Sequence, residues 1–280
     1  MNELPDFIDT DNPEFQDALR LIQYTNSSVY LTGRAGTGKS TFLRYVCDNT
    51  HKKYIVLAPT GIAAINAGGV TIHSFFKVPF RPILPNDPDL SAKDRRIYDF
   101  LKYNKAKIQL LREVELIIID EISMVRGDIL DFIDQVLRVF CGNKTAPFGG
   151  KQMLLVGDAF QLEPVVKRDE WQILSRFYKT PYFFSAQVFH RIPLVQIELK
   201  KVYRQSDPVF VDILDKIRVK RAGSFEFQTI NKRLFPDFKV PDDEFFITLA
   251  TRRDTVDYIN EQKLNGLQGS EHAFDGVISG

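Results

Sequence analysis

The sequence is poor in several features that would place a protein in a specialised class. It has two cysteines, Cys47 and Cys141, among 280 residues. Both lie in apolar helical patterns without metal-site spacing, so we expect buried free thiols and a reducing compartment. No run of about 18 apolar residues is present, so we expect no membrane span and no membrane partner. The opening residues resemble neither a secretion signal nor a transit peptide.

The chain also lacks an excess of charge of either sign. Its formal net charge is +1, from 37 basic and 36 acidic residues. A surface for a polyanion would therefore be a local stripe, because there is no global positive field. Hydrophobic residues make up 44% and charged residues 26%. These values are ordinary for a globular protein, and the length allows one large domain or two smaller ones.

A complete phosphate-binding loop is the most specific motif in the chain. Residues 33–40 read Gly-Arg-Ala-Gly-Thr-Gly-Lys-Ser, between an apolar run at 29–31 and a helical pattern that begins at Lys39. The glycines let backbone N–H groups approach phosphate oxygens, and the helix start adds a dipole that favours anions. Lys39 would reach the β- and γ-phosphates, and Ser40 would ligate Mg²⁺. The residues expected to bind the nucleotide here are Gly33, Ala35, Gly36, Thr37, Gly38, Lys39, Ser40 and Thr41.

Apolar runs and helical patterns alternate along much of the chain. The runs that read as buried strands are 29–31, 54–58, 116–119, 153–156 and 195–199, and the helical patterns are 12–24, 128–140 and 207–218. This alternation predicts an α/β fold with a parallel sheet and helices on both faces. In such folds the chemistry gathers at the carboxyl ends of the strands.

Two places interrupt the alternation. Segment 77–112 begins Pro-rich and then becomes basic and aromatic, and we interpret it as an inserted subdomain. After the run at 195–199 the pattern starts again, which puts a domain boundary near Lys200. We therefore expect a first domain at 1–199 and part of a second at 200–280.

Polar side chains follow the predicted strands where each one ends. Asp120 and Glu121 come directly after the run at 116–119. Asp120 suits a Mg²⁺ site, and Glu121 suits the base that activates an attacking water, although a helix-capping pair is the alternative. Gln161 follows the run at 153–156 and would sense the γ-phosphate, unless this stretch is a plain turn.

A further pair lies beyond the predicted boundary. Arg204 would be an arginine finger that neutralises charge in the transition state, and Tyr203 would stack on adenine. Taken alone, Arg204 would be interpreted as a surface arginine, because most arginines are exposed. The proposed catalytic residues are Lys39, Asp120, Glu121, Gln161 and Arg204, with Ser40 and Asp120 as Mg²⁺ ligands.

Together these motifs resemble superfamily-one DNA helicases, specifically the petite-integration-frequency (Pif) family, with the RecD-like (type B) group as near relatives. Residues 33–40 resemble motif I of that family, 58–64 with 71–76 motif Ia, 119–124 motif II, 155–165 motif III and 203–207 motif IV. The resemblance implies a RecA-like phosphate-loop ATPase domain with ATP as its nucleotide. It also implies that Gln16 reads the adenine.

The family resemblance further implies a path for single-stranded DNA. The residues that we assign to this path are Pro59, Thr60, Gly61, Ile62, His73 and Phe75. Hydroxyl and backbone groups suit phosphate contacts, and aromatic rings suit base stacking. The alternative is that Phe75 belongs to the core and His73 caps a turn. The basic cluster at 102–112 is interpreted as a solvated helix face.

The resemblance implies ATP-driven 5′-to-3′ translocation on single-stranded DNA, with unwinding of duplex, forked or G-quadruplex DNA by a monomer. Roles in DNA repair, recombination and telomere maintenance, and a cytoplasmic location in the nucleoid of a bacterium, would accompany it. Two alternatives stay open. One is a phosphate-loop ATPase of another kind, such as a switch or a small-molecule kinase. The other is a nucleotide- and DNA-binding module without catalysis.

Motifs V and VI of the family do not occur before Gly280. We therefore expect the chain to stop early in a second RecA-like domain, with the first strand and helix of that domain at 245–260. Too little of a second core would then be present to enclose itself. On this basis we expect little turnover and no unwinding by residues 1–280 alone.

Overall fold

The computed structural model describes residues 8–91, 93, 95–204, 207–238, 246–267, 269, 272 and 276. The chain divides into two compact units, Met1–Ser224 and Phe225–Gly280, which are described separately. Gln205 and Ser206 of the expected motif IV, and Phe245 at the start of the expected second-domain strand, lie outside the described residues.

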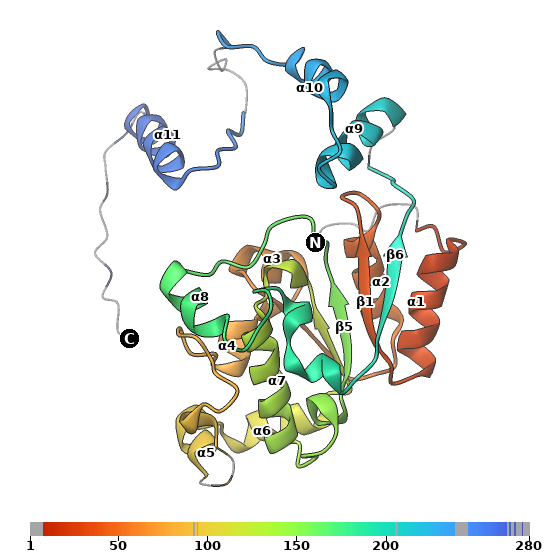
Figure 1. The fold of residues 1–280 in the computed structure, drawn as a ribbon, viewed down its shortest axis with the longest axis vertical. Helices are drawn as coiled ribbons and strands as arrows, with labels where there is room; N and C mark the ends of the chain where they lie inside the picture. Colours follow the sequence, from red (N-terminus) through yellow and green to blue (C-terminus); the bar gives the residue numbers. More distant parts are fainter. Residues whose placement is uncertain are drawn as a thin grey trace. The chain divides into compact units, whose positions relative to one another are not determined.

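A parallel sheet organises the first unit (Figure 1). Its strand order is β3-β2-β4-β5-β1-β6, and every pairing is parallel. The strands are β1 (Ser28–Gly33), β2 (Tyr54–Ala58), β3 (Val70–Thr71), β4 (Leu116–Ile119), β5 (Gln152–Val156) and β6 (Leu194–Leu199). This confirms the predicted α/β class. Because the strands are parallel, their carboxyl ends meet at one edge of the sheet.

Helices connect the strands and cover both faces. The α-helices are α1 (Pro13–Tyr24), α2 (Lys39–Asn49), α3 (Gly61–Asn66), α4 (Ile72–Phe76), α5 (Arg96–Leu101), α6 (Lys105–Glu113), α7 (Gly127–Phe140), α8 (Arg168–Leu174), α9 (Pro208–Arg218), α10 (Ser224–Asn231) and α11 (Arg253–Asn265). Short 3₁₀ helices are η1 (Pro88–Leu90), η2 (Ile122–Met124), η3 (Pro147–Gly150), η4 (Phe183–Ser185) and η5 (Gln187–His190). Helix α1 begins as its sequence predicts, since Asn12 caps it by accepting a hydrogen bond from the N–H of Phe15 at 3.0 Å.

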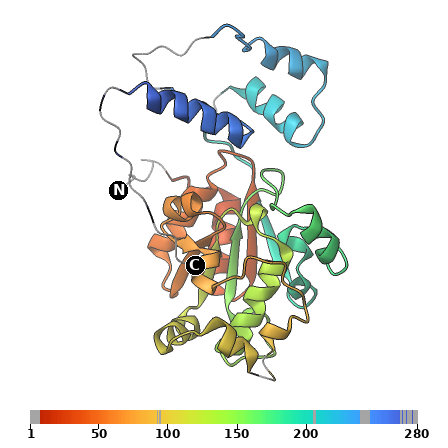
Figure 2. The same cartoon turned by 90° about the vertical axis from the view of Figure 1, so that its left-hand side faces the viewer.

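Two hydrophobic clusters lie on opposite faces of the sheet, and the alternation along β4 shows how they divide. Ile117 and Ile119 belong to the larger cluster, which includes the apolar face of α7. Leu116 and Ile118 belong to the smaller cluster, with α1 and α2. Successive side chains of a strand point to opposite faces, so a strand that is apolar at every position is buried on both sides. Figure 2 shows α7, in yellow-green, lying along the strands.

The segment between β3 and β4 contributes to the larger cluster. Ile83, Leu90, Ile97 and Leu101 are all buried in it. The segment at 77–112 is therefore an excursion from the sheet order whose apolar side chains join the common core. Its interpretation as a separate subdomain, like the domain boundary near residue 200, stays a prediction, and the first compact unit extends to Ser224.

The second unit contains α11 and all of α10 except its first residue, and its residues 246–252 adopt no strand. A helix was expected in this region and is present, whereas the expected strand is absent from the described part. A strand needs a hydrogen-bonded neighbour, and all strands that the structure describes belong to the sheet of the first unit. Ile247 and Leu249 accordingly remain exposed.

Within the described ranges, no helix has the length and apolar character needed to cross a bilayer. Cys47 and Cys141 are free, as predicted, but only partly buried. Burial raises the pKa of the Cys47 thiol to about 11, so it is a weak nucleophile at neutral pH.

Candidate functional site

The phosphate-binding loop joins β1 to α2 and depends on its glycines. Gly36 and Gly38 have φ angles of 79° and 89°, in the region that favours glycine. A Cβ on Gly36 would lie 2.7 Å from the Cβ of Arg204. The loop therefore takes its shape from backbone freedom and from close packing against the chain that follows β6.

Lys39 closes the loop on itself. Its Nζ donates to the carbonyl oxygens of Gly33 at 2.7 Å and Arg34 at 3.1 Å. Burial lowers the pKa of this lysine, and the nearby carboxylates of Asp158, Glu121 and Asp120 oppose that effect. A phosphate bound to the loop would offer the ammonium a charged partner in place of the two carbonyl groups.

A pocket of about 500 Å³ opens beside the loop, and we call it the loop pocket. It collects residues from five separate parts of the sequence. The predicted site residues that line it are Ala35, Gly36, Thr37, Gly38, Lys39, Ser40, Thr41, Glu121, Gln161, Tyr203 and Arg204. The fold thus brings together the loop, the end of β4, the turn after β5 and the segment after β6.

The two carboxylates after β4 lie before the short helix η2, and the side chain of Glu121 does not cap it. Glu121 precedes η2 in a left-handed conformation (φ 50°, ψ 43°) and makes no side-chain capping bond. Burial, helped by the charge of Glu121, raises the pKa of Asp120 to about 6, although the N–H of Glu121 donates to its Oδ1 at 2.9 Å. The capping alternative is therefore not supported.

A second space of about 320 Å³, the carboxylate hollow, lies beside the loop pocket. Ser40 and Asp120 both line it, together with Glu121 and Gln161. A hydroxyl and a carboxylate are the hard oxygen ligands that Mg²⁺ prefers, so these residues fit that ion. The described residues contain no cluster of three or more His, Cys, Asp or Glu placed to hold a metal. Mg²⁺ at phosphate sites needs only one or two carboxylates, because waters and phosphates complete its shell.

The turn that carries Gln161 is built on Asp158, which the sequence reasoning did not single out. The carbonyl of Asp158 accepts from the N–H of Gln161 at 2.9 Å, and its Oδ1 accepts from the N–H of Phe160 at 3.1 Å. The Asp158 side chain is buried and pairs with Arg218 of α9. Its place directly after a strand was the available signal, because polar residues at strand ends cluster in this fold.

The segment before α1 also lines the loop pocket, through Ile8, Asp9 and Asn12. The hydroxyl of Tyr203 donates to Asp9 at 2.8 Å and accepts from Asn12 at 3.3 Å. The backbone N–H of Tyr203 donates to the carbonyl of Gly36 at 2.8 Å. Tyr203 is thus held at the pocket rim by the segment before α1 and by the phosphate-binding loop, which sequence spacing does not reveal.

Gln16 is not among the residues that line the loop pocket. Its side-chain amide donates to the carbonyl of Thr10 at 3.0 Å. In this structure Gln16 therefore stabilises the segment that carries Asp9 and Asn12, and it does not reach the pocket itself. Its role in adenine recognition stays a prediction.

A third space, of about 390 Å³, lies at the ends of β2 and β3, and we call it the His73 groove. Of the residues assigned to DNA, Pro59, Thr60 and His73 line it. The imidazole of His73 stacks on Phe80, with ring centroids 5.4 Å apart and an interplanar angle of 11°. Phe80 is 93% exposed, so its other face is open. Sequence reasoning missed Phe80, although an aromatic residue in a Pro-rich loop was a usable signal.

The remaining residues assigned to DNA differ in their exposure. Ile62 is 76% exposed, and a Cβ on Gly61 would meet nothing within 4 Å, so both lie at an open surface. Phe75 is a core residue, and its assignment to the DNA path is corrected. The ring of Phe75 is buried in the larger cluster, and Nζ of Lys107 lies 2.9 Å from its centroid. A base would find no free face there.

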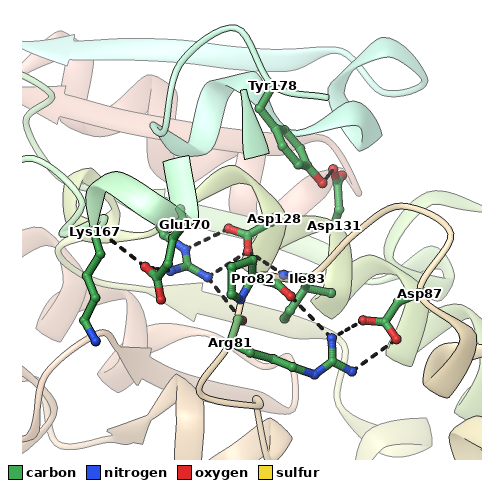
Figure 3. Close-up of polar contacts among 10 residues, drawn as sticks. Arg81, Pro82, Ile83, Asp87, Asp128, Asp131, Lys167, Glu170 and Tyr178 are labelled. Atoms are coloured by element: carbon green, nitrogen blue, oxygen red, sulfur yellow. Dashed lines mark hydrogen bonds and ion pairs between the residues drawn. The ribbon is translucent and has the colours of Figure 1, made fainter. Parts of the chain in front are cut away.

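Buried ion pairs hold the walls of the His73 groove (Figure 3). Arg126 donates to Asp128 at 2.8 Å and to Glu170 of α8 at 3.3 Å. Asp128 in turn accepts from the N–H of Ile83 at 3.0 Å. Arg81 pairs with Asp87 within the excursion. These bonds join the excursion, the start of α7 and α8, which no local sequence pattern predicted.

The match to a family model decides which protein family this geometry belongs to. Residues 13–220 match the model described as PIF1-like helicase. The chain belongs to the PIF1-like helicase family. The expected resemblance is thereby confirmed, and its RecA-like fold is confirmed by solved structures of other members.

A Pif1 helicase from Bacteroides, solved in complex with ADP-AlF3 and ssDNA, is 43% identical, with a TM-score of 0.84. The match covers 95% of this chain and 59% of that one. The yeast Saccharomyces cerevisiae protein "ATP-dependent DNA helicase RRM3" is 32% identical over 272 residues, which are 94% of this chain and 35% of that protein. The human protein "ATP-dependent DNA helicase PIF1" is 30% identical over 270 residues, or 38% of its length. The chain therefore spans little more than a third of these two curated relatives.

Proposed function

We propose that this PIF1-like protein hydrolyses ATP and uses the energy to move along single-stranded DNA as a helicase. The observation that carries the proposal is a shared wall between two sites. Thr60 and Met124 line both the carboxylate hollow and the His73 groove. A change at the γ-phosphate side of the wall can therefore reach the groove directly, which is what a DNA motor requires.

On the nucleotide side, the residues have distinct roles in the proposed hydrolysis. Lys39 binds the β- and γ-phosphates, and Ser40 and Asp120 would hold the Mg²⁺ that neutralises developing phosphate charge. Glu121 accepts the proton of the attacking water. Gln161 contacts the γ-phosphate, and Arg204 adds positive charge in the transition state. Tyr203 lies where the base of the nucleotide would stack.

On the DNA side, we propose that the His73 groove binds the strand. Thr60 and the backbone at Gly61 are suited to a phosphate, and Phe80 offers an open ring on which a base can stack. The exposed Lys167 also lines the groove and supplies local positive charge to a nearly neutral chain, whereas the charge of Arg81 is balanced by Asp87 and Asp89. The Bacteroides relative was solved with ssDNA, which supports single-stranded DNA as the ligand that this chain binds.

Finer features are proposed from family membership. They are 5′-to-3′ movement, unwinding of forked and G-quadruplex DNA, action as a monomer, and a second RecA-like domain to which residues 200–280 belong. The study of forked dsDNA with two coordinating Pif1 helicases concerns a relative that is 43% identical. Unwinding assays with a fork carrying either a 5′ or a 3′ tail decide the direction, because only a 5′ tail should be productive.

The decisive experiment compares ATP hydrolysis with and without single-stranded DNA, in a chain that also contains motifs V and VI of the family, because we expect little turnover by residues 1–280 alone. A DNA motor should hydrolyse ATP faster when DNA is added, and the stimulation should fall with salt because phosphate contacts release counterions. A phosphate-loop switch or small-molecule kinase would show no stimulation. Nucleotide binding without any hydrolysis would favour a non-catalytic binding module instead.

A further inference from the structure

Helix α9 carries two ion pairs to two different nucleotide-binding loops. Asp215 pairs with Arg34 of the phosphate-binding loop, and Arg34 also donates to the carbonyl of Lys200 at 3.0 Å. Three residues later, Arg218 pairs with Asp158 of the Gln161 turn. Positions three apart lie on neighbouring parts of one helix face, so a single rigid element contacts both loops.

The Arg218 pair is the more buried of the two and has the stronger geometry. Nε of Arg218 donates to Oδ2 of Asp158 at 3.0 Å, and Nη2 donates to Oδ1 at 2.8 Å. The Asp158 side chain is 1% exposed and that of Arg218 is 18% exposed. The guanidinium also lies 4.3 Å from the ring centroid of Phe160. A lysine could not make this forked and stacked contact.

The signs of the charges make the arrangement specific. The phosphate-binding loop presents a cation, Arg34, and the Gln161 turn presents an anion, Asp158. Helix α9 meets them with the opposite charges in the matching order. A shift that exchanged the partners would bring like charges together, so the two pairs fix the position of α9 across the loops.

Asp158 and Lys39 have separate hydrogen-bond partners. Nζ of Lys39 donates to the carbonyl oxygens of Gly33 and Arg34. By engaging both oxygens of Asp158, Arg218 leaves the Lys39 ammonium available to a phosphate.

We propose that α9 is a coupling element in which Arg218 positions the γ-phosphate-sensing turn and Asp215 positions the phosphate-binding loop. Both are positioning residues, since neither lines the loop pocket. The inference rests on the proposed function, in which Gln161 contacts the γ-phosphate. Movement of the turn on γ-phosphate loss would then be passed to α9, which ends six residues before the second unit begins at Phe225.

The test is the ratio of two affinities, measured with the 280-residue chain by fluorescence titration in the presence of Mg²⁺. The probes are ADP and a non-hydrolysable ATP analogue. Arg218→Gln should leave ADP affinity nearly unchanged and weaken the analogue about tenfold or more, the cost of one hydrogen bond to a charged group. Asp215→Asn should weaken both nucleotides by a similar factor, because Arg34 is in the loop that binds either one.

Asp212→Asn is the matched control on the same helix. Asp212 is 60% exposed and pairs with Lys216 within α9 itself, so its loss should change neither affinity. Arg218→Lys keeps the charge but loses the fork, and it should give an intermediate ratio. It also serves as the test variant if Arg218→Gln does not fold.

Two failures are distinguishable. If the wild-type chain binds both nucleotides but folded Arg218 variants keep the wild-type ratio, the pair is merely structural and the coupling role is wrong. If the wild-type chain binds neither nucleotide, the proposed function is wrong and this inference fails with it.

Discussion

The loop pocket and the His73 groove lie at the same edge of the sheet but are assembled differently. In the loop pocket, one continuous stretch, 35–41, supplies the largest single share of the lining through backbone geometry and short side chains. The His73 groove takes its lining from the ends of β2 and β3, the excursion, η2, α7 and α8. Its walls are held by side-chain pairs such as Arg126 with Asp128.

Because they are assembled differently, the loop pocket and the His73 groove should respond differently to mutation. A site made by a local loop is lost when the one lysine that binds phosphate is lost, while the fold survives. In a site made by many elements, some residues are needed for binding and others for stability. These residues can be as close in sequence as Phe75 and Phe80. Five substitutions test the comparison, from the largest expected effect to the smallest, with hydrolysis rates measured in a chain that also contains motifs V and VI.

Lys39→Ala should reduce ATP hydrolysis to the limit of detection without changing the melting temperature. Lys39 bonds only to carbonyl groups of its own loop, so little packing is lost, whereas a missing transition-state charge contact costs on the order of 3 kcal/mol or more. Circular dichroism and a steady-state ATPase assay measure the two quantities. Lys179→Ala, at an exposed position, is the control. Normal turnover by Lys39→Ala would remove the loop pocket as the site of hydrolysis.

Glu121→Gln should separate binding from turnover on the nucleotide side. The amide cannot accept the proton of water, so the rate should fall by roughly two to four decades. Nucleotide affinity should persist, because the loop contacts remain. Single-turnover hydrolysis and equilibrium titration with the ATP analogue measure the two properties. Loss of affinity together with turnover would make Glu121 a metal ligand or a structural residue.

Phe75→Ala and Phe80→Ala form a matched pair on the groove side. Phe75 is 8% exposed and Phe80 is 93% exposed. Phe75→Ala should lower the free energy of unfolding by about 3–5 kcal/mol, the usual cost of a large core deletion. Phe80→Ala should leave stability unchanged and weaken binding of single-stranded DNA by about 1–3 kcal/mol, the worth of one stacked base. Chemical denaturation and fluorescence anisotropy with an oligonucleotide provide the measurements. If Phe75→Ala weakened DNA binding and Phe80→Ala lowered stability, the assignment of Phe75 to the core and of Phe80 to DNA binding would be wrong.

Lys107→Met should give the smallest effect, a gain in stability of about 1 kcal/mol at pH 7 after the lost cation–π attraction is allowed for. Burial, with the charge of Lys77, lowers the pKa of Lys107 to about 8. The folded state therefore carries the full cost of the charge below pH 8, and the unfolded chain keeps the proton until about pH 10.4. Wild-type stability should rise relative to the variant between these pH values. Denaturation at pH 7 and pH 10 tests this, and an unchanged difference would mean that Lys107 titrates normally.

The strands and site residues that could be predicted from the sequence are those whose structure depends on nearby residues in the chain. The strand runs at 54–58 and 116–119 were predicted with the bounds that β2 and β4 have, because strands buried on both faces are apolar at every position. The loop residues were predictable because their chemistry depends on spacing within eight positions. Gln16 and Phe75 were placed by motif position, and their contacts in the fold differ from that placement.

By itself, the sequence determined the parallel α/β architecture, the phosphate-binding loop and the polar residues at the strand ends, because each depends on neighbours a few residues away. Only the tertiary structure decided which distant residues complete those sites. Arg218 meets Asp158 across 60 positions of the chain, and Tyr203 meets Asp9 across 194. Such pairs depend on how helices and loops pack on the sheet, and a charge pattern in a single sequence holds no record of its partner.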